Sequence, residues 1–231
     1  MQNALTTDPL EDDFSDDPTG ERVGPVELAS RLAARLCHDF ISPASAIVSG
    51  IDLIEDPEQQ DMREEAIALI AASSRKLAAL LTFSRIAFGG SAASESFDAR
   101  ELERLTRDFY EHCRAELDWQ TTPPSLAKPA ARALLNLAQV GATALPVGGK
   151  ASLRVEEADG HTRLFLDAVG PRARLRPEAV DGLSGQPFSE GLGGQWVQCY
   201  FLKAIVDKAC GTMDFTVEPE AIRVIIDLPT E

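Results

Sequence analysis

The chain has 231 residues, which is enough for one large domain or two small ones. Hydrophobic residues make up 44% of it and charged residues 26%, a composition that predicts a packed core and argues against global disorder. The net charge of −15 argues against nucleic acid as a partner, because binding phosphates requires a basic surface. The cysteines form no CxxC pair that would indicate a zinc or redox site; they are Cys37, Cys113, Cys199 and Cys210.

Two further features bear on where the protein works. No apolar run approaches the roughly 18 residues of a membrane span, and the N-terminal residues lack the basic start and apolar stretch of a secretory signal. We therefore expect a cytoplasmic protein that contacts no membrane. Residues 1–22 are rich in acidic side chains and predict a disordered tail; the acidic residues are Asp8, Glu11, Asp12, Asp13, Asp16, Asp17 and Glu21.

Residues 23–90 predict a long helical hairpin. The helical pattern covers about 26–55 and 58–87, with Pro57 suited to the first turn of the second helix. At about 1.5 Å per residue, each helix is a rod of roughly 45 Å. One hairpin of this kind leaves apolar surface uncovered, so we expect a homodimer in which two hairpins form a four-helix bundle.

Residues 91–231 differ in kind from the hairpin and predict an α+β domain with helices on one face of a sheet. A glycine- and serine-rich linker at 89–94 separates the two parts. We expect short strands at 96–99 and 117–121, β-hairpins at 151–169 and 212–228, helices at 99–115, 129–144 and 194–210, and a loop at 170–190.

His38 lies on the outer side of the first helix. On a helical wheel it falls roughly 200° from Leu36, the centre of the predicted core stripe, which comprises Leu32, Leu36, Phe40, Pro43, Ile47, Ile51 and Ile54. An exposed histidine on its own usually has no function. The residues that share its face are small or apolar where a solvated helix would carry charges, which favours a docking surface for another protein; they are Ala34, Ile41, Ser42, Ser45 and Val48.

The residues around His38 also match a known motif. The run from His38 to Pro43, HDFISP, resembles the H-box on the first helix of the dimeric hairpin of histidine kinases. The wider string LCHDFISPASAIVSGIDLIED resembles the ChpT-type histidine phosphotransferases of bacterial phosphorelays, and the resemblance covers roughly residues 25–231. It implies that His38 accepts a phosphoryl group from the receiver domain of a hybrid histidine kinase and donates it to response regulators of the CtrA and CpdR types.

Two neighbours of His38 are candidates for the same chemistry. Neutral imidazole is a nucleophile near pH 7, and Asp39 would orient the ring by accepting from its second nitrogen. Adjacent residues do not face each other on a helix, so this contact depends on the rotamers, and an ordinary exposed charge is the alternative. Arg35, one turn earlier, would act on the transferred phosphoryl group, with an exposed arginine of no special role as its alternative.

The second domain resembles the ATP-binding domain of histidine kinases with a decayed nucleotide site. Residues 131–138 resemble the kinase N-box, but Val140 stands where the pattern has a second asparagine, and valine cannot bind Mg²⁺. Gly170 is out of step with the glycine box expected after Asp167, and only the turn at 191–194 is retained. The resemblance therefore implies no ATP and no resident cofactor, with Mg²⁺ supplied by the receiver domain.

Three arginines alternate in the loop that follows, at Arg172, Arg174 and Arg176. In an extended segment they would project from one side and would attract the acidic pocket of a receiver domain placed beside His38. A solvated loop with scattered charges is the alternative.

Two other functions remain open on the sequence. An active ATP-dependent histidine kinase would bind ATP and phosphorylate its own histidine, and Val140 argues against this function. A non-catalytic dimeric scaffold for receiver domains would keep its function without His38, whereas a phosphorelay protein would lose transfer.

Overall fold

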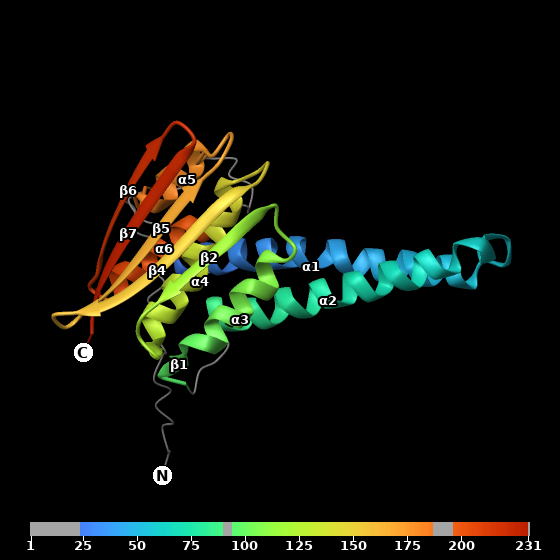
Figure 1. The fold of residues 1–231 in the computed structure, drawn as a ribbon, viewed down its shortest axis with the longest axis horizontal. Coiled ribbons are helices and arrows are strands. Elements are labelled where there is room, and N and C mark those ends of the chain that lie inside the picture. The colour runs from blue at the N-terminus through green and yellow to red at the C-terminus, as the bar shows by residue number, and fades with distance from the viewer. Residues whose placement is uncertain (1–23, 90–93, 187–195, 231) are drawn as a thin grey trace, which may run out of the picture.

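The computed structural model describes residues 24–89, 94–186 and 196–230, and the predicted acidic tail and the glycine turn at 191–194 lie outside them. Figure 1 shows a long helical hairpin projecting from a mixed α/β domain. The hairpin consists of α1 (Pro25–Glu55), a 3-10 turn η1 (Pro57–Met62) and α2 (Arg63–Ala87). The predicted hairpin is thus present, as a pair of helices close to the expected lengths.

The second helix begins later than the sequence pattern predicted. Side-chain hydrogen bonds hold the connection between the helices in another conformation: Asp56 accepts from the Glu58 backbone N–H at 2.9 Å, and the Gln60 amide donates to the Asp56 carbonyl at 2.7 Å. Such local bonds compete with the regular α-helix. Residues 57–62 are therefore a tight turn, and the α-helix starts at Arg63.

The two helices pack closely where side chains are small. Pro43 and Gly50 are the buried residues of α1, and a Cβ at Gly50 would lie 2.6 Å from Cγ1 of Ile70, so glycine permits this approach. Ile51 was expected in the core stripe but is 42% exposed, because the buried side of α1 centres on Pro43 and Gly50. Much apolar surface stays uncovered on this hairpin, including Val48 and Ile67.

The segment Pro57–Ala87 is long and apolar enough to cross a membrane, with a mean hydropathy of 1.5 in its best window. This corrects the expectation that no apolar run in the chain approaches the length of a membrane span. Two observations favour a protein environment for it. Arg75 and Lys76 lie at the middle of α2, where a bilayer centre disfavours charge, and the end of α2 is buried in the second domain.

The second domain is built on a five-stranded sheet of order β2-β4-β5-β7-β6. Only the β2–β4 pair is parallel, and α4 and α6 pack on one face of this sheet, as the fold class predicted. A small sheet of β1 and β3 lies apart. The elements are β1 (Ser96–Asp98), α3 (Ala99–Tyr110), β2 (Ala115–Thr121), β3 (Ser125–Ala127), α4 (Lys128–Ala144), β4 (Gly149–Ala158), β5 (His161–Val169), α5 (Pro177–Leu183), α6 (Val197–Lys208), β6 (Thr212–Glu218) and β7 (Ala221–Pro229).

Two elements of this domain differ from the sequence expectation. The helix predicted at 99–115 ends at Tyr110, whose hydroxyl donates to the Ala138 carbonyl at 2.7 Å, and Ala115 already pairs with β4. The predicted loop at 170–190 contains α5, which starts with Pro177 in its first turn. The hydrophobic pattern predicts neither difference. The first depends on a hydrogen bond to a distant residue, and the second on a proline in the first turn of a helix.

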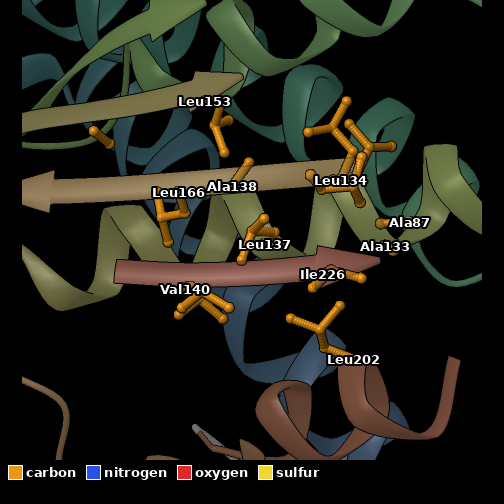
Figure 2. Close-up of a cluster of buried hydrophobic side chains, with 14 of the residues drawn as sticks. Ala87, Ala133, Leu134, Leu137, Ala138, Val140, Leu153, Leu166, Leu202 and Ile226 are labelled. Atoms are coloured by element: carbon orange, nitrogen blue, oxygen red, sulfur yellow. The ribbon is translucent and has the colours of Figure 1, made fainter. Parts of the chain in front are cut away.

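One hydrophobic core joins the hairpin to the second domain. Leu134 and Leu137 of α4, Leu202 of α6 and Ala87 from the end of α2 belong to one cluster of buried side chains that also includes residues of the sheet (Figure 2). Phe83 and Ile86 of α2 are also buried in it. The predicted domain boundary at 90–91 is therefore a change of architecture but no break in the core.

Candidate functional site

His38 projects from α1 with 70% of its side chain exposed. Its Nδ1 lies 3.4 Å from Oδ1 of Asp39, and Oδ2 of Asp39 accepts from Nε of Arg35 at 2.7 Å. One carboxylate thus contacts both the imidazole and a guanidinium. In the tautomer whose Nδ1–H donates a hydrogen bond to Asp39, Nε2 carries a lone pair and can act as the nucleophile.

The Arg35–Asp39 pair extends what the sequence analysis proposed. A contact between Asp39 and His38 was expected, whereas an ion pair between Asp39 and Arg35 was not. The sequence contained a signal for it, since opposite charges four residues apart face each other on a helix. The side chains are shielded, with 18% of Arg35 and 25% of Asp39 exposed, so this pair is less screened than a typical surface ion pair.

The residues predicted to share the face of His38 are all exposed. Ile41 is 65% exposed and Val48 57%, and smaller side chains lie between and beside them; these are Ala34, Ser42 and Ser45. No Lys or Glu interrupts this face near the histidine. The result is an apolar surface, named here the His38 face, around an exposed nucleophile.

The three arginines alternate outward as expected. Arg172, Arg174 and Arg176 are exposed, while Ala173 is buried and Leu175 half-buried. The segment is held by the Arg174 backbone N–H, which donates to the Ala144 carbonyl at 3.0 Å, and the Arg176 guanidinium lies 5.9 Å from the Trp196 ring centroid. These contacts are to the end of α4 and to Trp196 at the start of α6, and neither of them is to α1.

The predicted remnant of a nucleotide site is small and apolar. Val140 is buried, and beside it lies a hollow with room for about one water molecule, lined by Val140, Thr143, Leu175, Trp196, Gln198 and Cys199. Sites for small organic ligands usually measure about 300–1,000 Å³ and include several polar groups. Asp167 alternates to the other face of the sheet, where Arg223 donates to it at 3.2 Å.

Metal-binding potential is low in the part of the chain that the structure describes. Among those residues no group of three or more His, Cys, Asp and Glu side chains is arranged to hold an ion. The asparagine of the predicted N-box, Asn136, is fully buried and donates to the Ala87 and Arg132 carbonyls. That the protein works without a resident cofactor stays a prediction.

Comparison with known proteins places this architecture in a family. The family described as "Histidine phosphotransferase C-terminal domain" matches residues 99–221. The chain belongs to the histidine phosphotransferase family. This phosphotransferase is 31% identical over 185 residues to "Protein phosphotransferase ChpT" from Brucella abortus (strain 2308), a match that covers 80% of this chain and 87% of that protein.

A solved structure supports the same assignment over the hairpin as well. The structure described as "1.7 Angstrom Structure of a Bacterial Phosphotransferase" matches with a TM-score of 0.79 at 29% identity, covering 88% of this phosphotransferase and 97% of that chain. The resemblance to ChpT-type proteins and the fold class of a helical hairpin followed by an α/β domain are confirmed. The protein is a histidine phosphotransferase of two-component signalling.

Proposed function

We propose that His38 accepts a phosphoryl group from the receiver domain of a hybrid histidine kinase and passes it to response regulators, of the CtrA and CpdR types by resemblance. The observation that carries this proposal is the exposed imidazole of His38, with Oδ1 of Asp39 at its Nδ1. The apolar His38 face around it suits the docking of a receiver domain.

The transfer step is a displacement at phosphorus. Nε2 of His38 attacks the phosphorus of the receiver's aspartyl phosphate, the N–P bond forms, and the P–O bond to the aspartate breaks, which releases the carboxylate. The proton stays on Nδ1, where Asp39 stabilises the positive charge that the ring acquires. The Mg²⁺ of the receiver domain neutralises the phosphoryl oxygens, and most of the rate comes from positioning. Donation to a response regulator is the reverse reaction.

Independence from ATP is part of this proposal. Three observations support it: Val140 at the second asparagine position, the small apolar hollow beside it, and Asp167 directed to the other face of the sheet. An active kinase would require a polar pocket with ligands for Mg²⁺ in this place.

The deciding experiment measures the transfer of a radioactive phosphoryl group to the protein. Wild-type protein is incubated either with a phosphorylated receiver domain and Mg²⁺, or with radiolabelled ATP alone. We expect acid-labile label on the phosphotransferase from the receiver and none from ATP. Label taken directly from ATP would make the protein a kinase, and no label from any receiver domain would favour the scaffold function.

Asp39→Asn should slow the transfer by about 100-fold, in the range of a lost acid–base or orienting group. The variant keeps the size of the side chain but loses the charge that contacts His38 and Arg35. Initial rates of label transfer from a receiver domain measure the effect. Asp52→Asn, an exposed acid on the same helix, is the matched control. A wild-type rate for Asp39→Asn would exclude Asp39 from the reaction.

The segment with Arg172, Arg174 and Arg176 should affect the rate of association with the acidic receiver domain and not the phosphoryl-transfer step itself. We expect Arg172→Glu/Arg174→Glu to lower the transfer rate by about tenfold at low ionic strength and much less at high salt, because screening weakens steering between exposed charges. The control with the same change in charge is Arg100→Glu/Lys208→Glu, two exposed positions elsewhere. If both double variants behave alike, the segment is an ordinary solvated loop.

The uncovered hairpin supports the proposed homodimer. Ile67 and Leu81 of α2 are exposed and lie two heptads apart, a spacing that repeats on one helix face. Sedimentation should give twice the chain mass of 24.9 kDa, and Ile67→Lys/Leu81→Lys should shift the protein to monomers. Val217→Lys, on an exposed position of β6, should stay dimeric. A wild-type protein that sediments as a monomer at micromolar concentration would contradict the dimer.

A further inference from the structure

A single buried side chain links the exit of the hairpin to the second domain. Asn136 of α4 donates through Nδ2 to the Ala87 carbonyl at 2.9 Å and to the Arg132 carbonyl at 2.8 Å. Ala87 is the last residue of α2, where carbonyls have no donor within the helix, and it is fully buried. Asn136 therefore supplies a hydrogen-bond donor to a carbonyl at the buried end of α2.

The same residue is joined to α6. The Gln198 amide, also buried, donates to the backbone carbonyl of Asn136 at 3.3 Å. Phe201, one turn later on α6, packs against Phe88 at 5.5 Å and lies under the Arg132 guanidinium at 5.4 Å, both measured to its ring centroid. The ends of α2, α4 and α6 thus meet at one point, named here the Asn136 joint.

From this joint α6 reaches the His38 site. α6 packs against α1. Cys199 follows Gln198 and is buried there; burial raises the pKa of its thiol to about 12, and the positive charge of Arg35 acts in the opposite direction. This electrostatic influence agrees with the packing of α6 against α1, the helix that carries Arg35. Its Nε holds Asp39, and Asp39 contacts His38.

We propose that Asn136 and Gln198 are positioning residues for phosphoryl transfer: the Asn136 joint holds α6 against α1, and α6 in turn fixes Arg35 and Asp39 beside His38. This inference rests on the proposed role of His38 as the phosphoryl acceptor. It gives the second domain a task in the reaction that does not involve ATP. Mutations along a chain of packed and hydrogen-bonded side chains can change the coupling between distant groups by several-fold.

The test compares full-length variants that lose a buried hydrogen bond in different places. Asn136→Ala removes the bond to Ala87, and Gln198→Leu removes the bond between α6 and α4. Thr106→Val is the matched control, because Thr106 is fully buried and its hydroxyl bonds only within α3, to the Leu102 carbonyl at 2.7 Å. The readouts are the ¹⁵N resonances of the His38 imidazole and the rates of labelling by phosphoramidate and by a phosphorylated receiver domain.

For Asn136→Ala and Gln198→Leu we expect altered His38 ¹⁵N resonances and both labelling rates lowered by about five- to tenfold. Thr106→Val should match the wild type in both readouts even where it lowers the melting temperature. Wild-type resonances and rates in folded Asn136→Ala would overturn the proposal, as would an equal loss in Thr106→Val. If Asn136→Ala does not fold, Gln198→Leu decides by the same readouts.

The two proposals fail in different ways. If wild-type protein takes no label on His38 from either donor, the proposed function fails, while the His38 resonances of the variants still show whether the joint reaches the imidazole. If the wild type is labelled and the variants are unchanged in both readouts, only the positioning role fails.

Discussion

His38→Gln is expected to abolish phosphoryl acceptance, with label from a receiver domain at least about 1,000-fold below wild type and at background. Glutamine is polar and of similar length but has no nucleophilic nitrogen. Since His38 is exposed and outside the core, the free energy of unfolding of the variant should lie within about 0.5 kcal/mol of the wild-type value. The variant then loses phosphoryl acceptance while it keeps its fold. Circular dichroism and a urea titration of the same sample test whether the fold is kept.

His112→Gln is the control for this substitution. His112 is an exposed histidine in the turn that follows α3, and no feature of the site involves it. It should keep full transfer. Wild-type labelling of His38→Gln would mean that another side chain accepts the phosphoryl group, and mass spectrometry of the labelled peptide would identify it.

The largest loss of stability is expected for Phe83→Ala. Phe83 is fully buried where α2 enters the shared core, and its ring stacks on Phe109 with centroids 4.6 Å apart. Removing a buried phenylalanine costs about 3–5 kcal/mol, through lost transfer energy and the cavity that remains. Urea denaturation followed by fluorescence and by circular dichroism measures it.

Val217→Ala, on an exposed position of β6, should change the free energy of unfolding by less than about 0.5 kcal/mol. The two optical signals should also change together for the wild type, because the hairpin end and the sheet share one core. A loss below about 1 kcal/mol for Phe83→Ala would show that the end of α2 is only loosely packed on the second domain.

Sequence patterns predicted the parts of this fold that depend on local periodicity. The long helices α1 and α2 and the two β-hairpins lie close to their expected positions, because their apolar residues repeat with the period of each structure. The end of α3 was misplaced, since it depends on a hydrogen bond from Tyr110 to Ala138, 28 residues away. The start of α2 was misplaced because side-chain bonds at Asp56 favour a turn.

The site shows the same division. The outward position of His38 followed from spacing on one helix, whereas its contact with Asp39 depends on rotamers that spacing does not determine. The hydrogen bond between Asn136 and Ala87 joins residues 49 positions apart in the sequence, and no local sequence pattern predicts it. The alternation of the three arginines was visible in the sequence, but their distance from α1 depends on how the two parts of the molecule pack.

The shared core also determines where this protein can be cut and recombined. A chimera that joins the hairpin of one relative to the second domain of another at the glycine linker would leave Phe83, Ile86 and Ala87 in a foreign core. A junction between the middle of α2 and Phe83 keeps these three residues with the helices and strands that enclose them. Partner preference encoded on the His38 face can then be exchanged as a unit, while the end of α2 stays with the domain it stabilises.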